Sequence, residues 1–280
     1  MHSSAHSSHD SIPPQITTLR IEKFYSKHLK RHVHIDIFLP PSYYQTEDKF
    51  PVLYANDGQD MPAVALETTL LNLFQEDKLP ELLVVAIHTN KERIQEYGTA
   101  AMPDYANRGS KAANYTKFMI EELVPYVQQL YRVKREAAST AFMGFSLGGL
   151  SAFDISWHYS YIFGKVGVFS GSFWWRKKAY EDGYDDHNDR IMQVLVRNGS
   201  YKKGLKMWFQ VGTKDETEDR NNNGIIDAID DTLDMMIELE RKGYKRDIDI
   251  RYVAIEGGEH TTQTWASCLP DFLMWAFATN

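Results

Sequence analysis

The sequence of 280 residues predicts an α/β fold, in which a mostly parallel sheet of about eight strands is flanked by helices. Three observations support this prediction. Short, nearly continuous apolar segments, typical of strands buried on both faces, alternate with segments of helical periodicity. Near the start, an extended segment shows the polar and apolar alternation of an antiparallel strand with one buried face. In residues 140–150 an apolar run stops at a Gly-x-Ser-x-Gly turn, and helical spacing follows.

Length and a hydrophobic content of 43 % fit one large domain, which we expect to comprise residues 16–280. Residues 1–15 begin with a stretch rich in Ser and His and are expected to form a disordered leader. Their start lacks the apolar core of a signal peptide, and no apolar run approaches the roughly 18 residues of a membrane span. We therefore expect no membrane partner, while a cytoplasmic location and export after processing both remain open.

Charge and cysteine content exclude several other classes of protein. The formal net charge is -7 with interleaved signs, so no basic stripe is available and no nucleic-acid partner is expected. The single cysteine, Cys268, excludes an intramolecular disulfide and any site with several cysteine ligands. The sequence leaves the oligomeric state open.

The first half of the chain is expected to contribute four strands, at 16–25, 33–39, 50–55 and 82–87. Helices are expected at 63–74 and 113–130, the second of them kinked by Pro125. The intervening segment 88–109 is long and rich in charged and aromatic residues. Because long irregular segments tend to be functional, we expect it to form one wall of a substrate cleft.

The second half continues the alternation. Strands are expected before Ser146 and at 166–169, 205–211 and 248–255, with helices from the Gly-x-Ser-x-Gly turn to His158 and at 191–196, 232–242 and 262–277. The helix at 232–242 has acids at its start and bases at its end, as the helix dipole favours. Trp174 and Trp175 follow a strand directly, which indicates either a pocket for an aromatic or sugar-like group or simple core packing.

The Gly-x-Ser-x-Gly turn is typical of a nucleophile elbow, where Ser146 occupies a strained turn between strand and helix with its hydroxyl presented above the sheet. Gly144 and Gly148 fit this interpretation, because side chains at those positions would collide where the backbone folds back. An ordinary Gly/Ser turn is the alternative. The strand before the motif and the amphipathic helix after it favour the elbow.

A serine hydroxyl becomes nucleophilic when a base takes its proton, and that base needs a third group to orient it. In sheets with an elbow the order along the chain is Ser, Asp or Glu, then His, each following a strand. Asp215 and His260 satisfy both conditions. Three further acids of the same loop remain alternatives to Asp215, namely Glu216, Glu218 and Asp219.

The oxyanion hole is expected to use two backbone N–H groups, those of Leu147 and Gln59. Leu147 follows the nucleophile, and Gln59 lies in a polar loop, 56–60, directly after an early strand. The remaining polar and aromatic side chains at this edge of the sheet are the candidates for contacting a substrate, namely Asp57, Arg93, Tyr97, Trp174 and Trp175.

Five short motifs together resemble the esterase D/enterochelin-esterase-like family of α/β-hydrolases; they lie at 56–59, 144–149, 169–172, 212–215 and 257–260. The resemblance covers nearly the whole chain after residue 15 and implies an α/β-hydrolase fold. Members of that family hydrolyse carboxylic esters, including siderophore trilactones, feruloyl and acetyl esters of plant polysaccharides, and S-formylglutathione. The resemblance also implies that Asp215 is the acid and Gln59 an oxyanion donor.

One insertion, 219–230, departs from that family pattern and resembles an EF-hand calcium loop. Oxygen-bearing groups stand at the ligand positions, with glycine at the sixth, so the candidate ligands are Asp219, Asn221, Asn223, Ile225, Asp227 and Asp230. The last position has Asp in place of the longer Glu, and no clear helix precedes the loop. A metal-free polar turn is therefore the alternative. Bound Ca²⁺ would stiffen the loop that aims Asp215, and no cofactor is expected for the chemistry itself.

The sequence therefore predicts a serine carboxylesterase that forms an acyl-enzyme on a small-molecule or glycan-linked ester. The two tryptophans favour a carbohydrate-linked feruloyl or acetyl ester. A siderophore trilactone is the alternative, because four basic residues could form a cationic pocket, namely Arg93, Arg108, Arg176 and Lys177. Acyl transfer to another acceptor and a calcium-dependent binding module with weak activity are further alternatives.

Overall fold

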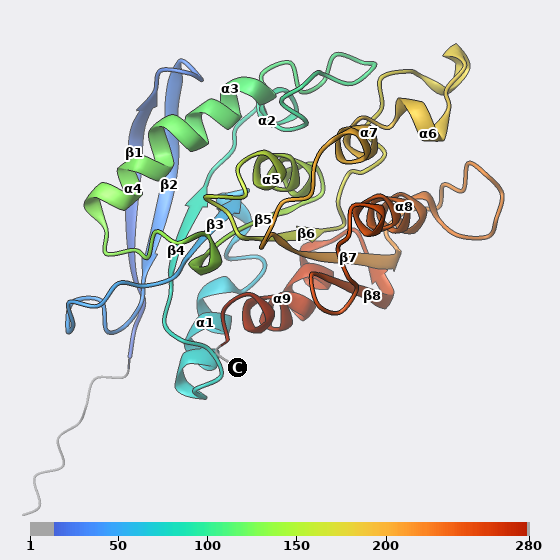
Figure 1. Cartoon of the computed structure of the whole chain (residues 1–280). Helices are drawn as coiled ribbons and strands as arrows, with labels where there is room; N and C mark the ends of the chain where they lie inside the picture. Colours follow the sequence, from blue (N-terminus) through green and yellow to red (C-terminus); the bar gives the residue numbers. More distant parts are fainter. Residues whose placement is uncertain (1–13, 279–280) are drawn as a thin grey trace, which may run out of the picture.

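A single twisted sheet forms the centre of the computed structural model, which describes residues 14–278 (Figure 1). Most of the leader expected at 1–15 therefore lies outside the described residues. The strand order is β1-β2-β4-β3-β5-β6-β7-β8. The strands are β1 (Thr17–Ser26), β2 (Arg31–Leu39), β3 (Val52–Asn56), β4 (Leu83–Ile87), β5 (Thr140–Phe145), β6 (Lys165–Phe169), β7 (Lys206–Lys214) and β8 (Ile250–Glu259). β2 pairs antiparallel with β1 and β4, and all later pairs are parallel, which confirms the predicted fold.

Helices cover both faces of this sheet because the central strands are apolar on both sides. Tyr54 and Phe142 point into one core, and their neighbours Leu53 and Met143 point into the other. The first core is closed by α3 (Ala112–Lys117), α4 (Val124–Leu130), α5 (Leu147–His158), α7 (Ile191–Asn198) and α8 (Asp227–Arg241). The second is closed by α1 (Leu66–Gln75) and α9 (Thr262–Phe277), which lie together on the opposite side of the sheet in Figure 1.

The predicted kink at Pro125 takes the form of a change in helical pitch. A π-helical stretch, Phe118–Leu123, joins α3 to α4, and Pro125 lies in the first turn of α4. Proline has no N–H to donate to the preceding turn, and the wider π-helical turn accommodates that missing hydrogen bond.

Two other predicted boundaries differ from the structure. α8 begins at Asp227 rather than at 232, so the last positions of the calcium-like loop already belong to the helix. The segment 88–109 contains one short helix, α2 (Arg93–Glu96), and the polar segment after β6 contains α6 (Asp186–Asp189). Periodicity could not predict these single turns, because they are too short to show a pattern.

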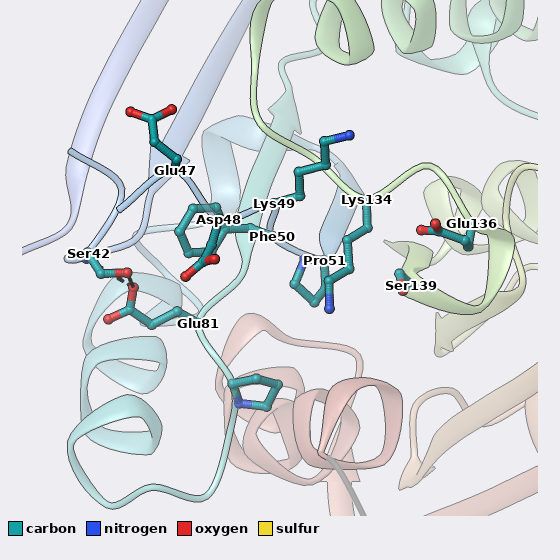
Figure 2. Close-up of a pocket in the computed structure, with 11 residues that line it drawn as sticks. Ser42, Glu47, Asp48, Lys49, Phe50, Pro51, Glu81, Lys134, Glu136 and Ser139 are labelled. Atoms are coloured by element: carbon teal, nitrogen blue, oxygen red, sulfur yellow. Dashed lines mark hydrogen bonds between the residues drawn. The ribbon is translucent and has the colours of Figure 1, made fainter. Parts of the chain in front are cut away.

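An open cavity of about 890 Å³ lies at the amino-terminal edge of the sheet. Phe50 and Pro51 precede β3, and Ser139 precedes β5; charged side chains such as Glu81 and Lys134 surround the opening (Figure 2). Ser146 lies at the other end of β5, so this cavity is separate from the predicted active site.

Within residues 14–278, no helix is both long and apolar enough to cross a bilayer.

Candidate active site

Ser146 stands between the end of β5 and the start of α5 with a φ of 54° and a ψ of -123°. A positive φ is unfavourable for a residue with a side chain, and such strain persists only where the surroundings impose it. Here the N–H of Ser146 donates to the carbonyl of Phe169 on β6 (2.8 Å), and its carbonyl accepts from Gly149 and Leu150 in the first turn of α5 (3.0 and 3.1 Å). The turn is thus fixed by the neighbouring strand and by the helix that follows.

Two glycines make this turn possible. A Cβ built on Gly144 would lie 2.3 Å from the carbonyl oxygen of Gly148, and one built on Gly148 would lie 2.7 Å from Oδ2 of Asp57. Both distances are far below van der Waals contact. Strand and helix can therefore pack this closely only with glycine on either side of the serine, which is the collision expected from the sequence.

Asp215 and His260 follow the neighbouring strands β7 and β8, and their loops touch. The hydroxyl oxygen of Thr213 accepts from the N–H of Gly257 (2.8 Å), and Lys214 pairs with Glu259. Nδ1 of His260 lies 4.0 Å from Oδ1 of Asp215, whose other oxygen accepts from the N–H of Gly212 (3.1 Å). Oδ1 itself is buried without a hydrogen-bond partner. A shift of about 1 Å would bring it within hydrogen-bond distance of the imidazole.

The other acids of this loop are directed elsewhere. Burial raises the pKa of the Glu216 carboxyl to about 7. The two carboxylate oxygens of Asp219 accept from backbone N–H groups of Asn223 (3.1 Å) and Gly224 (2.8 Å). Asp215 alone in this run lies within ion-pair distance of His260 among the described residues.

Trp265 links the histidine to the elbow. Its indole ring stacks on Phe145, the residue before Ser146, with centroids 4.7 Å apart, and it packs edge-on against the ring of His260 at 5.3 Å. Its Nε1 donates to Oγ of Ser170 (2.9 Å). Within residues 14–278 no hydrogen bond joins Ser146 to His260. The Oγ of Ser146 lies instead 3.5 Å from the hydroxyl of Ser172. Hydrogen bonds between a nucleophile and its base are often long in structures without substrate.

The electrostatic surroundings of His260 keep it neutral. Burial lowers the pKa of the imidazole; the nearby Asp215 carboxylate acts in the opposite direction, and the Arg93 guanidinium lowers it further. A neutral imidazole can accept a proton near pH 7, whereas an imidazolium cannot. The side chain is 41 % exposed, so the ring is accessible from solvent.

The loop after β3 is held against the segment after β4 by polar contacts. Asp57 has a left-handed backbone (φ 57°), and its carboxylate accepts two hydrogen bonds from Arg93 (2.7 and 2.8 Å) and one from the Thr89 hydroxyl (3.0 Å). The amide oxygen of Gln59 accepts from the N–H of Thr89 (3.1 Å). The N–H groups of Gln59 and Leu147 each lie in the first turn of a helix, where backbone donors have no partner within that helix.

The five predicted substrate contacts fall into different environments. Tyr97 and Trp175 are fully buried; Tyr97 packs on Tyr115, with its hydroxyl accepting from the N–H of Asp57 (3.1 Å). In this conformation neither side chain offers a surface to a ligand, so both belong to the packing that supports the site. The carboxylate of Asp57 is also buried and committed to Arg93, while Arg93 and Trp174 are partly exposed.

The calcium-like loop folds back on itself. Oδ2 of Asp230 accepts from the side chains of Asn221 (3.0 Å) and Asn223 (2.7 Å), so the side chains of three predicted ligands converge. Asp227 turns away and pairs with Arg220 (3.0 Å). No group of three or more His, Cys, Asp or Glu side chains suited to a metal ion is found in the part of the chain that the structure describes.

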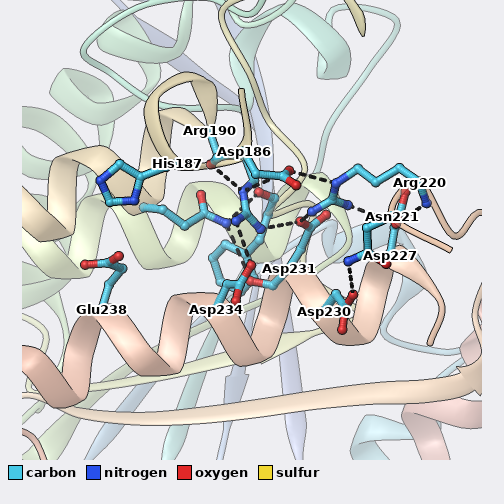
Figure 3. Close-up of polar contacts among 12 residues, drawn as sticks. Asp186, His187, Arg190, Arg220, Asn221, Asp227, Asp230, Asp231, Asp234 and Glu238 are labelled. Carbon is cyan, nitrogen blue, oxygen red and sulfur yellow. Dashed lines mark hydrogen bonds and ion pairs between the residues drawn. The ribbon is translucent and has the colours of Figure 1, made fainter. Parts of the chain in front are cut away.

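A cluster of charges around the buried Arg190 and Asp231 anchors this loop to the rest of the chain (Figure 3). Arg220 donates to Asp186 on α6 (2.8 Å) and to Asp231 on α8 (2.6 Å), and Arg190 donates to Asp231 and Asp234 (both 2.6 Å). The segment after β6, the loop after β7 and α8 are thereby joined. Sequence reasoning missed this cluster, because its members lie on three segments and form no motif.

Ser172 and Trp265 were also missed as parts of the site. Ser172 belongs to a motif singled out for family resemblance, but nothing in the sequence indicates that its hydroxyl faces Ser146. Trp265 lies five residues after His260, near the start of α9, and this closeness in sequence to the base is the signal that could have identified it.

Comparison with known proteins identifies the family and the fold of the chain. Residues 26–276 match the family described as "Putative esterase". The uncharacterized protein YbbA of Bacillus subtilis (strain 168) is 31 % identical over 158 residues, which cover 55 % of this chain and 62 % of YbbA, less than two thirds of that relative. A ferulic acid esterase superposes with a TM-score of 0.72 at 19 % identity, covering 94 % of this chain and 98 % of that one. The enterobactin esterase of Shigella flexneri gives 0.70 at 21 %, covering 94 % and 60 %. At such low identities, the likeness shows that this chain has the same fold as these two proteins.

The surroundings of His260 yield a prediction for NMR. A titration of its imidazole signals is expected to give a pKa below the ordinary value, because burial disfavours the cation. Asp215→Asn removes the carboxylate that favours the cation and should lower this pKa further. The His260→Gln variant assigns the signals. A pKa at or above the ordinary value, or a rise in Asp215→Asn, would contradict the described environment.

Proposed function

The chain belongs to the family described as "Putative esterase", and we propose that it is a carboxylic ester hydrolase with Ser146, His260 and Asp215 as its catalytic triad. One observation carries the proposal: a serine with a positive φ, held between a parallel strand and a helix that glycines allow to pack closely. It is the geometry that exposes a nucleophile above a sheet.

In the proposed mechanism, the Nε2 of His260 takes the proton of the Ser146 hydroxyl as its oxygen attacks the ester carbonyl. Nδ1 faces Asp215, whose carboxylate fixes the tautomer and stabilises the imidazolium. The imidazolium then donates its proton to the leaving alcohol, which leaves the acyl group on Ser146. Water, deprotonated by the same imidazole, releases the acid and restores the serine.

The charge on the carbonyl oxygen is proposed to be stabilised by the N–H groups of Leu147 and Gln59. Both are backbone donors in first helical turns, which supports the role. The hydrogen bonds from Thr89 and Arg93 hold the loop of Gln59 in place before substrate binds. Losing one such donor commonly costs about 10²–10³ in rate.

For the substrate we propose a carbohydrate-linked ester of the feruloyl or acetyl type. The partly exposed Trp174 beside the segment that carries Ser172 supports this assignment, and one protein of the same fold is a ferulic acid esterase. Cleavage of a siderophore trilactone is the second candidate, since another protein of this fold is an enterobactin esterase. Against it, Arg93 and Arg108 are already paired with Asp57 and Asp104.

Replacing the nucleophile tests the triad. Ser146→Ala is expected to lower kcat/KM for 4-nitrophenyl acetate by at least ~10⁴-fold, because the acyl-enzyme cannot form. Ser200→Ala is the matched control, since it removes an exposed serine hydroxyl outside the site and should keep the activity. Equal rates for wild type and Ser146→Ala would exclude Ser146 as the nucleophile.

We also propose that the loop 219–230 binds Ca²⁺ in a structural role. The convergence of Asn221 and Asn223 on Asp230 supports such a centre, and Asp219 with the carbonyl of Ile225 would complete it. Asp227 would have to leave Arg220 or act through water. The ion would stiffen the loop after Asp215 and take no part in ester cleavage.

Calcium binding predicts a thermal shift. At a concentration about 100-fold above its Kd, Ca²⁺ should stabilise the protein by ~2.7 kcal/mol and raise Tm on the order of 5 °C. Asp230→Asn should abolish the shift, and an equal concentration of Mg²⁺ controls for ionic strength. An unchanged Tm in millimolar Ca²⁺, with or without prior chelation, would leave the loop a metal-free turn.

A further inference from the structure

The guanidinium of Arg176 is buried without a counter-charge. The residue is 8 % exposed, and its Nε is enclosed with no hydrogen-bond partner. Among residues 14–278 no carboxylate lies within ion-pair distance of it, and its side chain makes no hydrogen bond. A guanidinium stays protonated at any physiological pH, and burying an unpaired charge is costly.

Arg190 is buried to a similar extent as Arg176 but has carboxylate partners. Arg190 is 5 % exposed, and two carboxylates neutralise it, those of Asp231 and Asp234 at 2.6 Å each (Figure 3). Arg220, close to the same cluster, also pairs with aspartates. Arg190 and Arg220 thus hold segments together as charges neutralised by carboxylates. Arg176, which is buried to a similar extent as Arg190, has no carboxylate partner among the described residues.

Three tyrosine rings surround the Arg176 guanidinium. Its Cζ lies 3.9 Å from the ring centroid of Tyr180, 4.6 Å from that of Tyr105 and 5.6 Å from that of Tyr184. Ring faces attract a cation and hold the planar group in place. They supply no in-plane acceptor for its N–H groups, so the hydrogen-bonding capacity of the guanidinium is left for another molecule.

The position of Arg176 connects it to the nucleophile. Ser172, whose hydroxyl lies 3.5 Å from that of Ser146, is four residues earlier, a span of at most ~14 Å between Cα atoms. The carbonyl of Arg176 accepts from the N–H of Tyr105 (2.9 Å), which joins it to the segment 88–109. Arg176 therefore belongs to the segment after β6 that also brings Ser172 to the nucleophile, and its Cα lies at most ~14 Å from that of Ser172.

We propose that Arg176 is a specificity residue that binds an anionic group, such as a carboxylate, several bonds away from the scissile ester. The inference rests on the proposed function and specifies that the ester substrate carries a negative charge. The guanidinium would offer its fork of N–H donors to the anion, while the tyrosines hold it in place. An anion bound there neutralises the charge that the protein leaves unpaired.

Matched ester pairs test the proposal. On the acyl side, mono-4-nitrophenyl adipate is compared with 4-nitrophenyl hexanoate; on the alcohol side, 4-acetoxybenzoate is compared with its methyl ester. For at least one pair the ratio of kcat/KM, anionic over neutral, should fall by about 10–100-fold in Arg176→Met, as expected for the loss of hydrogen bonds to a charged group. Arg176→Lys keeps the charge but loses the planar fork of N–H donors. Its ratio should therefore lie between those of the wild type and Arg176→Met.

Lys177→Met is the control. It removes the same charge one residue away, from a side chain that is 41 % exposed, and should leave both ratios within about twofold. A similar fall in Lys177→Met would show a general effect of charge and overturn the assignment. Ratios that do not change in Arg176→Met for either pair would overturn it as well.

A binding measurement separates this inference from the proposed function. Titration with benzoate and with its neutral isostere benzamide, followed by tryptophan fluorescence, requires no turnover. Benzoate should bind more tightly to the wild type, and Arg176→Met should remove the difference. If no ester is cleaved but benzoate is still preferred, the triad fails and the anion site stands. If esters are cleaved and the two ligands bind alike, the anion site fails and the triad stands.

Discussion

The strained backbone of Ser146 is the constraint on which the rest of the site depends. A residue with a side chain at this conformation costs about 1–3 kcal/mol, and it persists because β5, β6 and α5 fix it from three sides. The same close packing requires glycine at 144 and 148 and brings Asp57 against the start of α5. The position of the loop that carries Gln59 is thus a consequence of the turn at Ser146.

The opposite side of the site is organised by charge. The loop that begins after Asp215 is tied through Arg220 to α6 and α8, and Arg190 ties the segment after β6 to the same helix. Every carboxylate and guanidinium in these pairs has a partner of opposite sign. Arg176, which precedes Arg190 in the same segment after β6, is surrounded by aromatic rings instead. Within one segment the chain thus contains an arginine used for structure and another that is free for a ligand.

The sequence predicts the strands of the sheet more completely than the side chains that line the site. All eight strands were predicted because apolar runs and alternation report burial directly. The turn at Ser146 between strand and helix was predicted because it needs glycine at fixed spacing. The residues that line the pocket are harder to predict, because aromatic residues at strand ends serve packing and binding equally well. Tyr97 and Trp175 were predicted to contact substrate and are buried in this conformation. The partners of Arg190 and Arg220, and the lack of one for Arg176, depend on contacts between distant segments that no local pattern encodes.

The central claim is that Ser146 is activated by His260, although no hydrogen bond joins them in the ligand-free chain. Labelling with a fluorophosphonate, followed by peptide mass spectrometry, tests it most directly, because the reagent reacts with a serine only when a base takes the proton. The account predicts one adduct, on the peptide that contains Ser146, forming at least ~10³-fold more slowly in His260→Ala. An adduct on another residue, or the same labelling rate without the imidazole, would contradict it.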